Sequence, residues 1–208
     1  MLPAIWGHKT WHLLHIITIF PKRRQEYYEK FFYYLQFLLP CAKCRNSYKE
    51  HITALAIPKS KQEYALWLIQ VHNRVNKSID KPILEETDIL QEWQTKYAAT
   101  QSMKDTFLID VGEYILYGHP GYYGITEEVI EANLYFWNTV PKLLPYTIKD
   151  RQKLLVYLEE HPLDTEIVRS KTKYSKWFEK IKQLYAISKQ KRDEATTQCN
   201  TECSLTPN

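Results

Sequence analysis

Apolar residues that recur every three to four positions run through almost the whole chain of 208 residues. This period places apolar side chains on one face of a helix, and no segment shows the alternation of a convincing strand. Pro21 and Pro40 limit the first helices, because proline cannot continue the helical segments before them. The pattern predicts five helices in the first half, over residues 5–20, 25–39, 41–55, 63–78 and 85–97.

A polar stretch at residues 99–105 predicts a boundary after this five-helix unit. We therefore expect an all-α chain with domains at residues 1–98 and 104–192 and a polar tail at residues 193–208. The second domain should hold helices over residues 106–117, 126–144, 148–160 and 165–191. Its aromatic residues are interpreted mainly as core, with an interface as the alternative; they include Tyr122, Tyr123, Tyr135 and Trp137. No motif assigns chemistry to this domain.

The charge pattern and the N-terminus exclude several classes of protein. The formal net charge is only +4, and acids such as Glu179 interrupt the basic run at residues 171–192. We interpret that run as a solvated helix face rather than a nucleic-acid-binding surface. The first twenty residues lack the basic start and cleavage site of a signal peptide. No stretch reaches the roughly 18 apolar residues of a membrane span. We expect a cytosolic protein, in which cysteines stay reduced.

The segment LLPCAKCRNSY contains Cys41 and Cys44 in a Cys-x-x-Cys arrangement. Pro40 biases the residue before it away from helical geometry, so Cys41 should stand near a new helix start. Unpaired backbone N–H groups and the helix dipole favour a thiolate there. Lys43 and Arg45 add positive charge nearby. This arrangement favours a redox-active dithiol.

Two other interpretations of the cysteines remain open from spacing alone. Together with Cys199 and Cys203, the pair could form a four-cysteine zinc site in a helical interaction module. A thioredoxin-like dithiol oxidoreductase is the other alternative, although that fold needs a strand before its Cys-x-x-Cys. A spectrum dominated by helix would exclude the second, and stoichiometric zinc in a colourless protein would favour the first.

Three motifs in this order resemble the Erv/ALR family of FAD-dependent sulfhydryl oxidases. They are WGHKTWHLLH at residues 6–15, the Cys-x-x-Cys, and HNRVNKSIDKP at residues 72–82. The resemblance covers residues 2–97, and members from large DNA viruses look closest. It implies a four-helix bundle with a short fifth helix that holds FAD against the cysteine pair. Cys44 would lie next to the isoalloxazine ring, and incoming thiols would attack Cys41.

The resemblance also implies a set of FAD-binding residues and no metal. A flat ring needs aromatic walls, a diphosphate without a glycine loop needs cationic side chains, and asparagine offers both donors and acceptors. Cellular members commonly carry an arginine directly after the early glycine, where this chain has His8, so Lys9 could supply that charge. The implied residues are Gly7, Lys9, Trp11, His15, His72, Asn73, Val75, Asn76, Lys77, Lys81 and Trp93.

Family members often keep a second cysteine pair on a flexible segment, and Cys199 and Cys203 fit such a shuttle. The alternative is that they are incidental tail thiols. The resemblance implies electron transfer from thiol-containing substrate proteins through the pair to FAD and then to O2, which gives H2O2. It also implies a homodimer, and the viral members place the activity in host cytoplasm or a virion.

Overall fold

The computed structural model describes residues 3–19, 21, 23–99, 106–121, 124–144 and 151–184. Within these residues the chain is helical and contains no strand, which confirms the all-α prediction and excludes a thioredoxin-like sheet there. The first half holds α1 Pro3–Ile19, α2 Gln25–Leu38, α3 Ala42–Ala54, the 3₁₀ turn η1 Lys61–Glu63, α4 Tyr64–Ser78 and α5 Glu86–Ala99. The second half holds α6 Thr106–Tyr117, α7 Glu127–Leu143, α8 Arg151–Glu160 and α9 Thr165–Arg169.

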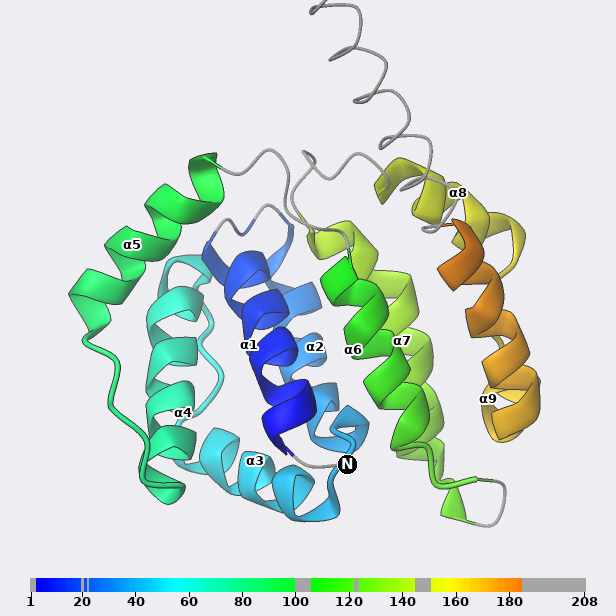
Figure 1. Cartoon of the computed structure of the whole chain (residues 1–208), viewed down its shortest axis with the longest axis horizontal. Helices are drawn as coiled ribbons and strands as arrows, with labels where there is room; N and C mark the ends of the chain where they lie inside the picture. The colour runs from blue at the N-terminus through cyan, green and yellow to red at the C-terminus, as the bar shows by residue number, and fades with distance from the viewer. Residues whose placement is uncertain are drawn as a thin grey trace, which may run out of the picture.

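The first four helices pack around an aromatic and aliphatic core. In Figure 1, α1 lies between α4 and α6, and α3 crosses below the bundle. Tyrosines on the helices join them through their hydroxyl groups as well as their rings. The Tyr48 hydroxyl on α3 donates to the Phe32 carbonyl on α2 at 3.0 Å, and the Tyr64 hydroxyl on α4 donates to the Gln25 carbonyl at 3.3 Å. These bonds satisfy polar groups inside the bundle and fix α3 and α4 relative to α2.

The second half packs directly on the first, because α6 lies along α1 and α7 lies along α2 (Figure 1). Both helices carry large apolar residues to this contact, including Phe136, which lies 6.4 Å from Phe31 between ring centroids. One hydrophobic cluster runs through both halves without interruption. The polar stretch predicted as a domain boundary therefore separates two groups of helices that share one core.

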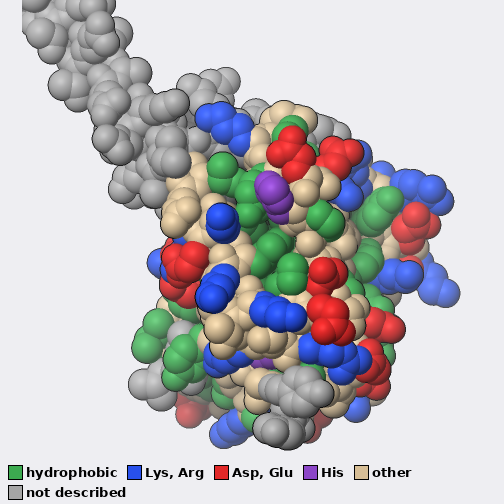
Figure 2. All heavy atoms as spheres, turned by 90° about the vertical axis from the view of Figure 1, so that its right-hand side faces the viewer, with side chains coloured by type: hydrophobic (Ala, Val, Ile, Leu, Met, Phe, Trp, Pro, Cys, Tyr) green, Lys and Arg blue, Asp and Glu red, His purple; other side chains and the backbone are tan. Residues whose placement is uncertain are grey.

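The last described helices cover the outer side of α7. The sequence predicted one helix over residues 165–191, and this is wrong: α9 ends at Arg169, Ser170 is extended, and a new helix runs over residues 171–184. The Ser170 hydroxyl accepts the backbone N–H of Lys173, so it caps the new helix. Figure 2 shows this face, where Lys and Arg side chains are interspersed with Asp and Glu around an apolar centre.

Candidate active site

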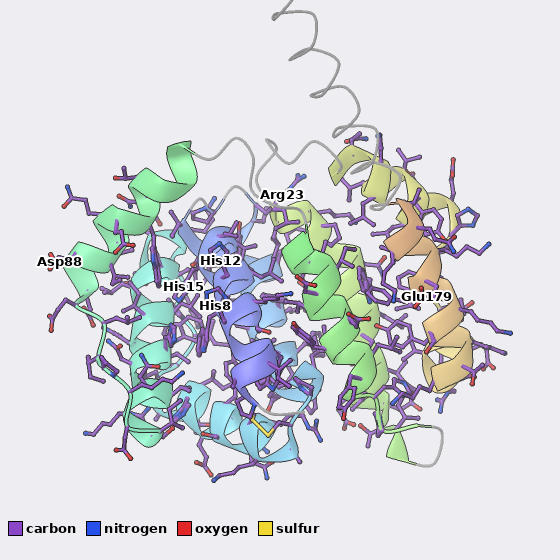
Figure 3. The ribbon with its side chains drawn as sticks, in the orientation of Figure 1. His8, His12, His15, Arg23, Asp88 and Glu179 are labelled. Atoms are coloured by element: carbon purple, nitrogen blue, oxygen red, sulfur yellow. A yellow bond between two sulfur atoms is a disulfide. The ribbon has the colours of Figure 1, made fainter. Side chains whose placement is uncertain are left out.

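The cysteine pair stands at the start of α3. Cys41 is the N-cap residue, with extended backbone, and its sulfur accepts the backbone N–H of Cys44 at 3.3 Å. The two residues form a disulfide with a Cα–Cα distance of 5.1 Å (Figure 3). Both are partly buried against the core. The helix start expected from Pro40 is confirmed, and a thiolate on Cys41 would lie at the positive end of the α3 dipole.

Arg45 holds the turn that leads into this helix. Its guanidinium donates to the Leu39 carbonyl at 2.7 Å, and its backbone N–H donates to the Cys41 carbonyl at 2.9 Å. Arg45, which the sequence predicted to act on the cysteines through its charge, thus also stabilises the backbone on both sides of Pro40. Its positive charge remains within the first turn of the helix, where it favours a thiolate.

Four rings from α1, α4 and α5 form a cluster that we call the ring cluster: Trp11, His15, His72 and Trp93. Trp11 and His72 lie 3.9 Å apart between centroids with their planes 8° from parallel. His15 and Trp93 also lie 3.9 Å apart, and Trp11 and His15 stack at 5.9 Å. The structure therefore brings together the four aromatic residues that the sequence predicted for the cofactor, from three helices.

The two histidines of the ring cluster are neutral at physiological pH. His15 Nε2 and His72 Nδ1 lie 3.1 Å apart, so one ring donates to the other. Burial lowers the pKa of His72 to about 4, with the positive charge of Lys81 adding to the effect. Burial also lowers the pKa of His15 well below its usual value, and His72 and His12 add to this. Neutral, stacked imidazoles offer a flat surface without the cost of a buried charge.

The asparagines of the third motif serve the loop between α4 and α5. Asn73 forms a pair of hydrogen bonds with the backbone of Leu84, donating to its carbonyl at 2.9 Å and accepting from its N–H at 2.8 Å. Asn76 donates to the Pro82 carbonyl at 2.9 Å. Both amides thus spend part of their hydrogen-bonding capacity on the loop that places α5, and hence Trp93, against α1. Their contact with a cofactor stays a prediction.

The predicted cations separate into two groups. Lys77 and Lys81 are exposed near the C-terminal end of α4, and Lys81 lies close enough to His72 to lower its pKa. Both could hold a diphosphate beside the ring cluster. Lys9 does not belong with them, because its ammonium forms an ion pair with Asp110 on α6 at 2.8 Å. That pairing speaks against Lys9 as the replacement for the family's arginine.

Gly7 and Val75 stay predictions as cofactor-binding residues. A methyl group on Gly7 would meet no atom within 4 Å, so no close packing requires glycine there. Val75 is half-buried on α4, on the same helix as His72. Cys199 and Cys203 lie outside the described residues, and the shuttle stays a prediction.

Sequence reasoning missed His12 and His51. His12 lies one turn before His15 on α1 (Figure 3) and helps to lower the pKa of His15. His51 joins α3 to α4: Nδ1 accepts from Arg74 at 3.4 Å, which leaves Nε2 to donate to the Ser47 hydroxyl at 3.2 Å. The four-residue spacing of Ser47 and His51 could have indicated this contact. The contact of His51 with Arg74 depends on how α3 and α4 pack, so only the fold reveals it.

A shallow hollow on α5 is not part of this arrangement. Its lining includes Asp88 and Glu92, whose charges disfavour a phosphate. Among the described residues no group of His, Cys, Asp and Glu could hold a metal ion. Across the same residues, no helix has the length and apolar character needed to cross a membrane.

Comparisons with known proteins place this site in a family. Residues 8–94 match the model of the Erv1 / Alr family. The FAD-linked sulfhydryl oxidase of African swine fever virus is 32% identical over 85 residues, which cover 38% of this chain and 71% of that protein. The chain belongs to the Erv1/Alr family.

Further relatives come from plants and other large viruses. The FAD-linked sulfhydryl oxidase ERV1 of Oryza sativa subsp. japonica is 32% identical over 93 residues, 42% of this chain and 48% of that protein. The chain thus spans about half the length of the rice relative. The probable FAD-linked sulfhydryl oxidase R368 of Acanthamoeba polyphaga mimivirus is 28% identical over 100 residues, 44% of this chain and 70% of that protein. The family match ends at residue 94, before α6, and no solved structure matches the chain significantly.

Proposed function

We propose that this Erv1/Alr chain is an FAD-linked sulfhydryl oxidase that makes disulfides in substrate proteins. The observation that carries the proposal is Cys41 at the N-cap of α3, disulfide-bonded to Cys44 within the family's domain. A thiolate is the nucleophile and the leaving group of disulfide exchange, and a helix N-terminus stabilises it. The ring cluster supports the cofactor, because stacked Trp and His rings with exposed lysines beside them suit a flat ring joined to a diphosphate.

The chain's own residues carry the exchange step. A substrate thiolate attacks the sulfur of Cys41, the Cys41–Cys44 bond breaks, and Cys44 leaves as a thiolate. The second substrate thiolate then attacks the substrate sulfur of the mixed disulfide, which releases the Cys41 thiolate and completes the substrate disulfide. The protein pair now holds the two electrons that the substrate has lost. The backbone N–H of Cys44 and the α3 dipole stabilise the Cys41 thiolate.

Trp11, His15, His72 and Trp93 would hold the rings of FAD, and Lys77 and Lys81 its diphosphate. The chemistry that bound FAD supplies is acceptance of two electrons from the reduced pair and their transfer to O2, which gives H2O2. The neutral state of His15 and His72 keeps positive charge out of the ring surface, so the lysines are the cations offered to phosphate there.

The experiment compares the wild-type protein with Cys44→Ser. The purified wild type should show a flavin spectrum that bleaches with dithiothreitol and recovers as oxygen is consumed and peroxide appears. C44S should keep the flavin and lose thiol oxidation at least a thousandfold, on the order of the loss of a nucleophile or leaving group. A colourless wild type that stays colourless after incubation with FAD would overturn the proposal.

The matched control for the tail is the double variant Cys199→Ser/Cys203→Ser. If these cysteines form a shuttle, this variant should keep its rate with dithiothreitol and lose rate with a reduced protein substrate. If the double variant kept the wild-type rate with both substrates, Cys199 and Cys203 would be incidental thiols. The tethered pair gains its advantage from effective concentration, which a small freely diffusing dithiol does not need.

We also extend the proposal to cellular context and assembly. Action in the cytoplasm and a homodimer are the states we expect for the whole protein, and light scattering tests the second. Because α6 and α7 already cover the sides of α1 and α2 that face them, those sides are not available to a homodimer interface.

A further inference from the structure

The end of α6 touches the residue that precedes the reactive cysteine. A methyl group on Gly118 would lie 2.5 Å from Cα of Pro40 and 3.1 Å from its Cβ. Cα of Pro40 is backbone and its Cβ is fixed in the pyrrolidine ring, so neither can move aside by changing a rotamer. Gly118 is therefore a position where the second half requires glycine in order to approach the first.

This contact lies close to the disulfide. The 2.5 Å separation puts Cα of Gly118 within about 4 Å of Cα of Pro40, and consecutive Cα atoms are about 3.8 Å apart, so Cα of Gly118 lies within about 8 Å of Cα of Cys41. Figure 3 shows the disulfide at the start of α3, on the side of the molecule where α6 ends. The redox pair is thus bordered by a segment that lies outside the family match.

A clamp in the second half holds the end of α6. The buried ring of His119 accepts the backbone N–H of Gly121 at Nδ1, at 3.1 Å, so its proton is on Nε2, which donates to the Val168 carbonyl at 2.7 Å. The ammonium of Lys171 donates to the carbonyls of Tyr117 and His119 at 3.3 and 3.4 Å. These bonds join the end of α6 to α9 and the helix after it, so that Gly118 presses against Pro40 from a fixed position.

Pro40 is held from both sides as a result. Arg45 bonds to the Leu39 carbonyl from within the first half, and Gly118 packs against Pro40 from the second. This turn determines where the N-cap residue Cys41 stands relative to the N–H groups of α3. If the turn moved, the Cys41 thiolate would lose the N–H of Cys44 and its place at the end of the helix.

We propose that Gly118 is a positioning residue for disulfide exchange, through which the second half sets the redox equilibrium of the Cys41–Cys44 pair. Gly118 acts through Pro40 and contacts no reacting atom. The inference rests on the proposed function of the pair and assigns the second half a part in it. A dithiol pair whose reduced form is stabilised is a stronger oxidant, so displacing Pro40 should make the disulfide harder to reduce.

The test measures the equilibrium of the pair with glutathione, in which two glutathione thiols become one glutathione disulfide as Cys41–Cys44 becomes a dithiol. It uses the full-length, flavin-containing protein without oxygen, in the Cys199→Ser/Cys203→Ser background, with alkylation and mass spectrometry to count thiols. Gly118→Ala should shift the equilibrium constant about threefold or more toward the protein disulfide. The spectrum of its oxidised flavin should match that of the wild type.

Gly112→Ala is the matched control. A methyl group there would lie 2.6 Å from the Trp137 ring and 2.9 Å from Phe178, a comparable conflict that is confined to the second half. G112A should lower thermal stability and leave the glutathione equilibrium at its wild-type value. An unchanged equilibrium in G118A, or equal shifts in both variants, would overturn the inference.

His119→Ala takes the place of G118A if that variant does not fold. It removes the two hydrogen bonds that the His119 ring makes in the clamp without adding an atom, and it should shift the equilibrium in the same direction by about twofold. A wild-type value in folded H119A would then overturn the inference. Failure of the proposed function looks different, because the wild-type protein itself would lack flavin or would not oxidise thiols.

Discussion

The two halves of the molecule each contain a cluster of aromatic rings, and the clusters differ in how their rings meet. In the ring cluster, the planes of Trp11 and His72 lie 8° apart and those of His15 and His72 lie 26° apart. In the second half, Trp137 meets Trp177 at 75° and Phe178 at 51°. Edge-to-face contact closes a core, whereas parallel faces can extend a stack to another flat ring.

The two clusters also differ in their polar atoms. In the second half, Trp137 Nε1 donates to the Tyr174 hydroxyl at 2.7 Å, which donates to Asn133 at 2.9 Å, and all three residues are buried. In the ring cluster, Trp11, His72 and Trp93 keep part of their surface in solvent. Aromatic content alone does not identify a cofactor site. The parallel Trp11–His72 pair and its incomplete burial are the features that favour the ring cluster as the proposed one.

The largest effect should come from Trp137→Ala. Removing a ring that is 1% exposed should cost about 3–5 kcal/mol of unfolding free energy, measured by urea denaturation. Because this cluster is structural, the folded fraction should keep its wild-type FAD affinity. Trp137→Phe, which keeps most of the volume, should recover part of the stability. Loss of FAD affinity in folded W137A would break the distinction between the clusters.

Trp11→Ala should have the opposite profile. We expect FAD affinity to fall ten- to a hundredfold, about 1.4–2.7 kcal/mol, because Trp11 provides the face that stacks at 3.9 Å on His72. Unfolding of the flavin-free protein should change by only about 1 kcal/mol, since the ring is partly exposed. Fluorescence titration with FAD measures the affinity, and Trp11→Phe should lose less. An unchanged affinity in W11A would remove the ring cluster from the site.

Tyr174→Phe tests the hydrogen-bond chain of the second half without a large change of volume. It leaves Trp137 Nε1 and the Asn133 side-chain oxygen without their buried partner, which should cost about 1–2 kcal/mol in denaturation. A double variant with Asn133→Leu should cost less than the sum of the two single changes, because one chain connects both residues. Full additivity would mean that the chain is not coupled.

Local features of the sequence predicted the helices and most of the site. Proline and apolar spacing placed α2 within one residue of its observed end at Leu38, and Pro40 placed Cys41 at a helix start. The family resemblance placed Trp11, His15, His72 and Trp93 together. Such features succeed because a helix boundary depends on neighbouring residues, and a motif carries its own local geometry.

Contacts between distant segments could not be predicted in the same way. Lys9 is committed to Asp110, more than one hundred positions away, and Asn73 to the backbone of Leu84. The extended backbone of Ser170 interrupts a continuous helical pattern where α9 packs against α7. Gly118 looks like any turn glycine until the fold places Pro40 against it. These positions depend on tertiary packing, which one sequence does not contain.

The pH dependence of stability again separates the clusters. Because the folded-state pKa of His72 is about 4, below its unfolded value near 6.5, its contribution to stability is complete above pH 6.5 and is lost as pH falls toward 4. Burial also lowers the pKa of His15, His51 and His119, so the wild type alone cannot assign the effect. The difference between wild type and His72→Phe in urea denaturation at pH 7 and pH 4.5 isolates it.

That difference should shrink by about 2 kcal/mol at the lower pH, since phenylalanine can stack on Trp11 but takes up no proton. The matched variant His119→Gln removes a histidine whose depressed pKa belongs to the structural clamp of the second half. H119Q should change the pH dependence of stability and keep the wild-type FAD affinity, whereas H72F should weaken FAD binding at both pH values. If H72F bound FAD as the wild type does, the imidazole of His72 would serve the stability of the bundle alone. One member of the ring cluster would then be structural, like the rings of the second half.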